Sequence, residues 1–198
     1  MALVMSCSPR LYSAIDLSSA FKLNEAAKEH KVYVSHLEVP VTVTTPPLTL
    51  DTPIDPTSAS FAVLSQGGPQ FTAFLENVQS ALLDAVVANK LAVLGRAVSD
   101  ETLKTNQKTF LDDDAVKVRV TDDVHAFDVV GRAVDVDHIP AGSRVRCVLE
   151  LARVCFGRAE WGGMWRVVQV RACETCHIPD ADPEESEEDL ADAVEEYL

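Results

Sequence analysis

The sequence has no long apolar run, few aromatic residues and few cysteines. None of its apolar stretches approaches the roughly 20 residues that a membrane-spanning helix needs, so we expect no transmembrane helix and no membrane partner. The first ten residues lack a charged segment followed by a long apolar stretch, so we expect no secretion signal. The cysteines form an odd, sparse set, which favours reduced thiols: Cys7, Cys147, Cys155, Cys173 and Cys176.

Enzyme motifs are also missing from the sequence. It contains no GxSxG, no P-loop and no GxGxxG, and His125 and His138 have no evident carboxylate and nucleophile beside them. The acidic runs at 112–114 and 122–123 are interpreted as loops between strands rather than as a divalent-metal site. We therefore predict a non-enzymatic protein with no cofactor and no metal.

One short motif leaves alternatives open. Cys173-Glu-Thr-Cys176-His177 has the spacing for covalent haem attachment, and it also resembles half of a zinc site. Haem attachment normally needs an exported chain, and zinc would need further ligands from elsewhere in the fold. Free thiols at the end of a strand are the favoured interpretation, and a metal or haem redox module is the third hypothesis for this protein.

The charge is distributed unevenly along the chain. The net charge is −14 at pH 7, but residues 180–198 hold ten acidic residues and no Lys or Arg. Residues 141–171 reverse this balance, because only Glu150 and Glu160 oppose six arginines: Arg144, Arg146, Arg153, Arg158, Arg166 and Arg171. A basic segment on an acidic chain favours binding of a polyanion. The alternative is that these arginines cover the solvated face of a sheet.

Aromatic residues lie within this basic segment. Trp161 and Trp165 flank Gly162-Gly163, and Phe156 precedes them. Indole and phenyl rings stack on nucleobases while arginines neutralise phosphates, so the segment is typical of a surface for single-stranded nucleic acid. A Trp in a hairpin is more often a core residue, and that alternative stays open for both tryptophans.

Hydrophobic periodicity predicts an α+β fold. Apolar residues at helical spacing predict an amphipathic helix over 71–94, ended by Gly95. Alternating patterns predict the strands 32–39 (extended through 41–45), 61–64, 116–120, 124–133, 143–152 and 164–172, with a turn at 159–163. Residues 48–57 are predicted to be a loop or an edge, and 96–114 a polar connector with another helical turn. Short strands at close spacing indicate a small barrel or sandwich.

The C-terminal half also resembles a known family. The strand 144–151, the aromatic stretch 154–156, a glycine turn and then Met164-Trp165-Arg166-Val167-Val168-Gln169-Val170 are similar to the single-stranded DNA-binding proteins of large nucleocytoplasmic DNA viruses, such as those infecting algae and amoebae. The resemblance spans roughly residues 61–171. It implies an OB-like antiparallel β-barrel with one packed amphipathic helix, and it makes Trp165 and Gln169 markers of the fold. The body of this chain has less lysine than is usual in that family.

These observations lead to one principal hypothesis. We expect an N-terminal extension (1–31), an OB-like barrel domain with the helix 71–94 (32–178) and a disordered acidic C-terminal tail (179–198). The protein would bind single-stranded DNA without sequence specificity in viral replication, recombination or repair, as a homo-oligomer, in the host cytoplasm (the viral factory), the host nucleus or the virion. The predicted binding residues are Arg144, Arg146, Arg153, Phe156, Arg158, Trp161, Trp165, Arg166 and Arg171.

The acidic tail suggests a second contact. A mobile polyanion competes with DNA for a basic groove and is released when a strand binds. The tail residues predicted to recruit replication proteins are Asp189, Glu195, Glu196, Tyr197 and Leu198. Two alternatives remain, which are a tail that only aids solubility and a virion structural or scaffold protein that binds other proteins through its barrel.

Overall fold

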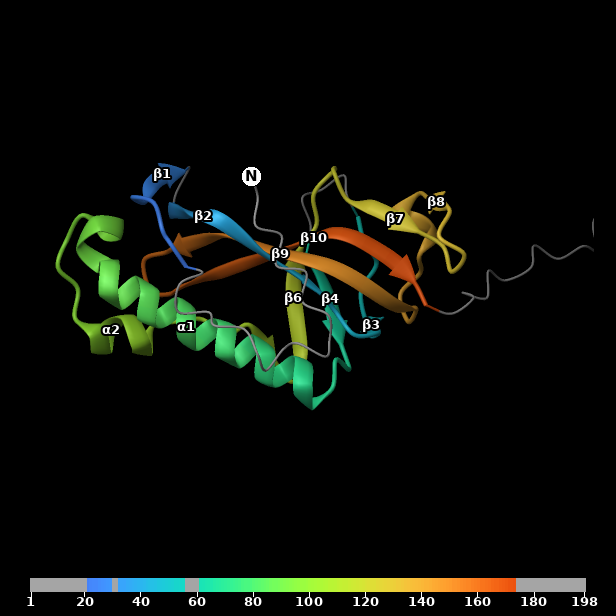
Figure 1. Ribbon diagram of the computed structural model, residues 1–198, viewed down its shortest axis with the longest axis horizontal. Coiled ribbons are helices and arrows are strands. Elements are labelled where there is room, and N and C mark those ends of the chain that lie inside the picture. The colour runs from blue at the N-terminus through green and yellow to red at the C-terminus, as the bar shows by residue number, and fades with distance from the viewer. Residues whose placement is uncertain (1–20, 30–31, 56–60, 174–198) are drawn as a thin grey trace, which may run out of the picture.

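The computed structural model describes residues 21–29, 32–55 and 61–173 (Figure 1). The predicted acidic tail, the segment 1–20 and part of the cysteine motif lie outside these residues. Among the described helices, none is long and apolar enough to cross a bilayer.

Five strands close into a barrel. They are β3 (Leu48–Leu50), β4 (Phe61–Ser65), β6 (Ala115–Arg119), β9 (Arg144–Phe156) and β10 (Trp161–Ala172). Around the ring, β9 pairs with β3, β3 with β4, β4 with β6, β6 with β10 and β10 with β9. The β6–β10 pair is parallel and the other four are antiparallel. This Greek-key order confirms the predicted OB-like barrel.

Further strands extend the sheet on both sides of the barrel. β2 (Val32–Thr44) pairs with β9, and β1 (Ala27–Glu29) pairs with β2. At the other end, β7 (His125–Phe127) pairs with β10 and with β8 (Ala133–Val134). The remaining short elements are β5 (Leu111–Asp112) and the 3-10 turn η3 (Val136–His138). As Figure 1 shows, β9 and β10 form a long hairpin that runs through the whole molecule.

Part of the predicted N-terminal extension packs against this body. The Phe21 side chain is buried in the core, and the Ala26 N–H donates to the Val93 carbonyl at 2.8 Å. β1 also adds a strand to the sheet beside β2. Residues 21–29 are therefore integrated with the barrel domain.

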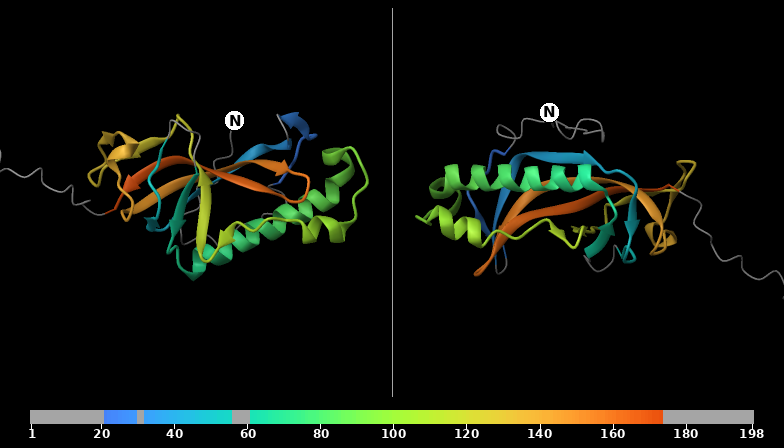
Figure 2. Two further views of the ribbon diagram at one scale, coloured as in Figure 1. Left: turned by 180° about the vertical axis from the view of Figure 1, so that it is seen from behind. Right: turned by 90° about the horizontal axis from the view of Figure 1, so that it is seen from below.

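The long helix is α1 (Pro69–Leu94), which confirms the predicted helix over 71–94. Proline fits at its first turn because the missing N–H would have no helical partner there. Gly95 ends the helix with a φ of 64°, a left-handed conformation that glycine adopts without strain. The apolar face is buried through Phe71, Phe74, Leu75, Val78, Leu82, Val86 and Val93. Figure 2 shows α1 lying along one face of the sheet.

A shorter helix follows, α2 (Asp100–Thr105), in the segment predicted to be a polar connector with a helical turn. Ser99 caps its N-terminus, because the Ser99 hydroxyl accepts a hydrogen bond from the Thr102 N–H. Both helices lie between the second and third strands of the barrel, β4 and β6. The segment that follows α2 then lies beside the start of β10, where Gln107 forms a parallel bridge with Trp161.

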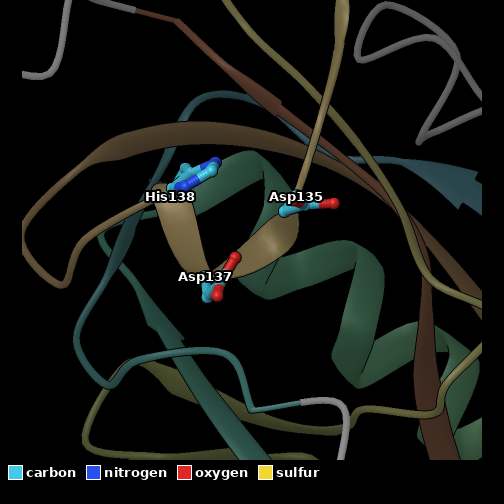
Figure 3. A group of neighbouring side chains, drawn as sticks. All are labelled: Asp135, Asp137 and His138. Atoms are coloured by element: carbon cyan, nitrogen blue, oxygen red, sulfur yellow. The ribbon is translucent and has the colours of Figure 1, made fainter.

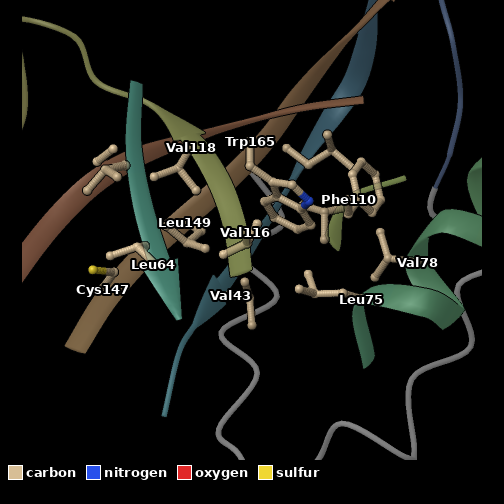
Figure 4. Packing of buried hydrophobic residues seen from close by; sticks show 14 of the residues in the cluster. Val43, Leu64, Leu75, Val78, Phe110, Val116, Val118, Cys147, Leu149 and Trp165 are labelled. Atoms are coloured by element: carbon tan, nitrogen blue, oxygen red, sulfur yellow. The ribbon is translucent and has the colours of Figure 1, made fainter. Parts of the chain in front are cut away.

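Trp165 lies in the centre of the core and is only 2% exposed (Figure 4). Its ring meets the Phe110 ring edge-on, with the centroids 5.8 Å apart and the planes at 68°. Its Nε1 has no conventional hydrogen-bond partner among the described residues, and in Figure 4 this nitrogen faces the Phe110 ring.

The Gly162-Gly163 pair is part of β10, so the predicted turn at 159–163 is corrected. The hairpin turns at 157–160, where the Gly157 N–H donates to the Glu160 carbonyl at 2.8 Å. A Cβ on Gly163 would lie 2.8 Å from Leu151 Cδ1 and 2.9 Å from Phe110 Cζ. The glycines are therefore needed for the close approach of Phe110 and its neighbours to β10.

The predicted strand over 124–133 is also corrected, because it is a hairpin of β7 and β8. Asp128 makes the turn, since its carboxylate accepts hydrogen bonds from the N–H groups of Val130 and Arg132. The Arg132 guanidinium also pairs with Asp128 at 2.7 Å.

Candidate nucleic-acid interface

The three aromatic residues predicted to stack on bases are buried. Trp161 is 4% exposed and Phe156 is 8% exposed, and Trp165 lies in the core. The Trp161 Nε1 donates to the Leu103 carbonyl at 2.7 Å, and the Phe156 ring stacks on Trp161 with centroids 5.7 Å apart. Their rings are covered by protein in this structure, and the stacking role of these residues stays a prediction.

The six predicted arginines fall into separate places. Arg144 ties β9 to the neighbouring edge of the barrel, since its guanidinium donates to the Pro47 carbonyl at 3.0 Å and the Thr49 hydroxyl at 3.1 Å. Arg146 and Arg171 face one another across β9 and β10, and Arg171 donates to the Val129 carbonyl. Arg158 lies exposed in the β9–β10 turn. A phosphate role for these four stays a prediction.

The other two arginines, Arg153 and Arg166, line an outer groove. This groove consists of two adjoining hollows, of about 300 and 230 Å³, that share Met164. The larger hollow lies among Phe61, Lys117, Cys155 and Gly163, and the smaller one among Arg119, Arg153 and Arg166.

A cross-strand row of side chains forms the floor of the outer groove. Phe61 lies opposite Arg119, and Arg119 lies opposite Arg166. Two residues before Arg166, Met164 lies opposite Arg153. Neighbouring strands are about 4.8 Å apart, so the row spans about 14 Å from β4 to β9. Long-range strand pairing thus gathers one aromatic ring and three arginines onto one surface.

Phe61 is the aromatic residue of the groove, and the sequence analysis did not select it. It is 45% exposed, and the Lys117 ammonium lies 4.8 Å from its ring centroid. The signal was the alternation in β4, where Ala62 and Leu64 are buried and Phe61 lies on the opposite face. The sequence alone did not show that Ala62 points into the core while the larger Phe61 points outward.

Three cations of the outer groove have no carboxylate partner among the described residues: Lys117, Arg119 and Arg153. Arg119 donates to the Met164 sulfur, at 3.8 Å. Two further cations are compensated. Lys108 pairs with Glu160 at 3.1 Å, and Arg166 pairs with two acidic residues. The groove therefore offers positive charge that protein carboxylates do not neutralise.

Arg166 forms ion pairs with two carboxylates beside the groove. Its Nε donates to Glu150 Oε1 at 2.9 Å and its Nη1 to Asp123 Oδ2 at 3.0 Å. The hydrogen bond to Glu150 is the main reason that the pKa of Arg166 is raised. The pKa of Asp123 is lowered, first by a hydrogen bond from the Thr121 hydroxyl and then by Arg166. Asp123 is thus ionised at neutral pH and occupies one donor of Arg166.

Metal chemistry has one structural candidate in the described residues. Potential ligand atoms of Asp135, Asp137 and His138 lie within 4.8 Å of one another, and all three residues are exposed. Figure 3 shows the three side chains on the same short turn, η3 and the residue that precedes it. The Asp112–Asp114 run forms the tight β5–β6 turn, with φ of 46° and 61° at Asp113 and Asp114.

The cysteines and the tail complete the predicted features. Burial raises the pKa of the Cys147 thiol to about 12, and burial also raises the pKa of Cys155 in the groove wall. Cys173 is exposed, whereas Cys176 and His177 lie outside the described residues, so the metal or haem hypothesis stays a prediction. The predicted tail contacts also lie outside them: Asp189, Glu195, Glu196, Tyr197 and Leu198.

The fold and the groove define an OB-like barrel protein with a cationic outer surface. The chain belongs to a family of unknown function, DUF5871, whose model matches residues 68–187. This match names no activity, so the resemblance to the viral family stays a prediction. A search of curated proteins found no match.

Solved structures of one other protein share part of the arrangement. The single-stranded DNA-binding protein from bacteriophage Enc34 is 11% identical, covers 77% of this chain and 90% of its own, and has a TM-score of 0.46. Its complex with single-stranded DNA is 12% identical, covers 76% and 94% respectively, and has a TM-score of 0.41. Similarity at this level carries no information about what this chain binds.

Proposed function

We propose that this protein binds single-stranded DNA in the outer groove, with little sequence preference. The observation that carries the proposal is the exposed Phe61 ring beside Lys117, Arg119 and Arg153, three cations that have no carboxylate partner within the described part of the chain. A strand crossing the row would stack a base on Phe61 and place its phosphates against the cations. Aromatic rings and cations are the two components that bind single strands without regard to sequence.

The larger biological role is also a proposal. The resemblance noted in the sequence suggests action in viral DNA replication, recombination or repair, in the host cytoplasm, the host nucleus or the virion. Homo-oligomerisation and recruitment of replication proteins by the acidic tail belong to the same proposal. The tail would compete with DNA for the groove because both are polyanions.

The test is a titration of the full chain into a fluorescently labelled dT oligomer, followed by anisotropy. The label must be on the DNA, because both tryptophans are buried and their emission is not expected to report a bound strand. Neutralising three phosphates predicts a log–log salt slope of about −2. The Phe61→Ala variant should bind about tenfold more weakly, through loss of one stacked base.

The matched control is Val130→Ala, which shortens another exposed apolar side chain (67% exposed) in the β7–β8 turn. It should bind like the unmodified protein. Absence of binding at low salt would overturn the proposal and favour the virion or scaffold hypothesis. Equal losses in both variants would remove Phe61 from the interface.

A further inference from the structure

Main-chain N–H and C=O groups lie along the edge of β10 that faces the larger hollow. The alternation of hydrogen bonds along the strand shows which residues supply them. The Trp161 N–H donates to the Asn106 carbonyl at 2.9 Å, and the Trp161 carbonyl accepts from the Lys108 N–H at 2.7 Å. Both Trp161 groups therefore point away from β9. In an antiparallel pair the direction repeats every second residue. Because the register stays regular from Trp161 to Met164, Gly163 presents its N–H and C=O on the same side.

The segment that pairs with Trp161 does not continue to Gly163. The Phe110 N–H donates instead to Gln79 Oε1 at 2.8 Å, which takes this segment onto α1. β6 joins β10 only where Arg119 meets Arg166, beyond the hollow. Throughout the described ranges, no hydrogen bond is found to the outward N–H or C=O of Gly163. Main-chain groups that are partly buried are normally paired, so these two are available to a ligand.

The surroundings of Gly163 indicate what ligand fits. Gly163 lines the larger hollow together with Phe61, Lys117 and Met164, so a flat ring on Phe61 and a hydrogen-bonding edge are offered in one place. The volume of about 300 Å³ is at the small end of ligand pockets, which suits a single planar group. A nucleobase has both an aromatic face and an edge on which donors and acceptors are adjacent.

We propose that one unpaired nucleobase enters this hollow, stacks on Phe61 and pairs its Watson–Crick edge with the main chain of Gly163. This inference rests on the proposed function. In thymine, N3–H donates to the Gly163 carbonyl and a ring carbonyl accepts from the Gly163 N–H. In cytosine and adenine, the exocyclic amine donates and the neighbouring ring nitrogen accepts. A duplex already uses these groups in base pairs, so the hollow selects nucleotides that are unpaired.

The experiment compares dT oligomers that carry one N3-methylthymidine, moved through every position, binding to the full chain. The methyl group removes the N3–H donor and leaves the ring able to stack. At one position or a few adjacent ones, affinity should fall about tenfold. If the unmodified oligomer binds and methylation has no effect at any position, the inference is wrong and the proposed function stands. If the unmodified oligomer fails to bind at low salt, both are wrong.

A substitution at Gly163 itself would disturb the core, because a Cβ there meets Leu151 and Phe110. The contact is instead assigned by measuring the effect of the methylated base in two protein variants. The methyl penalty should shrink in Phe61→Ala, where the base is no longer held against the edge, and remain in Val130→Ala. An undiminished penalty in Phe61→Ala would place the sensitive base elsewhere and overturn the assignment to this hollow.

Discussion

Replacing Asp123 with asparagine should increase the affinity for single-stranded DNA. The Asp123 carboxylate is 62% exposed and holds Arg166 Nη1 at 3.0 Å, so it occupies a donor in the row of arginines. A phosphate about 6 Å from this carboxylate would be repelled by about 0.7 kcal/mol in water. Removing the charge therefore predicts about a threefold gain. The freed Arg166 would also take up a phosphate and steepen the log–log salt slope by about 0.7.

The assay is DNA anisotropy at several salt concentrations, with thermal unfolding measured on the same samples. An exposed ion pair contributes only about 0–1 kcal/mol to stability, so Asp123→Asn should remain folded. The matched control is Asp128→Asn, whose carboxylate pairs with Arg132 in the β7–β8 turn. Unchanged or weaker binding by Asp123→Asn, with the same salt slope as the unmodified protein, would refute the view that Asp123 occupies a phosphate position.

Two further predictions concern the core. Cys147 should resist iodoacetamide at pH 8 in the native protein while exposed Cys173 is alkylated, because burial raises the pKa of Cys147 to about 12. An unfolded thiol titrates near about 8.5, so the unfolded state binds fewer protons above that pH. Stability should therefore fall as the pH rises from about 8.5 toward 12, and fall less steeply in Cys147→Ala; equal labelling of the two thiols by mass spectrometry would contradict this. Gly163→Ala should lower the free energy of unfolding in urea by about 1–3 kcal/mol, since its Cβ would be 2.8 Å from Leu151 Cδ1. Gly162→Ala should cost less, because its Cβ would lie no closer than 3.2 Å to Lys108 Cβ and 3.5 Å to the Lys108 carbonyl oxygen, and equal losses would count against this packing argument.

Local patterns predicted the elements of this fold well. The helix over 71–94 is present as α1, and the runs 61–64, 116–120, 143–152 and 164–172 correspond, within a residue at their ends where they differ, to parts of β4, β6, β9 and β10. These segments have strong periodicity, which depends only on neighbouring residues. The Gly162-Gly163 pair was misread as a turn because the sequence does not show that the Phe110 side chain packs against β10 there.

The candidate site depended on information that is not local. Arg153 and Arg166 were identified, but Arg119, Lys117 and Phe61 come from strands far away in the sequence. Only the pairings of β4, β6, β10 and β9 bring them together. Ion pairing is equally invisible in the sequence, and it distinguishes Arg166, held by two carboxylates, from Arg153.

The shared hairpin of β9 and β10 has a consequence for how the chain folds during synthesis. β2 and β3 both pair with β9, and β6 and β7 both pair with β10, so the early strands receive these partners only after residue 144 has been made. Contacts this distant in sequence close slowly. A nascent chain stopped before the hairpin would expose the edges of β2 and β6 and the apolar face of α1. Completion of the barrel therefore waits for β10 to leave the ribosome.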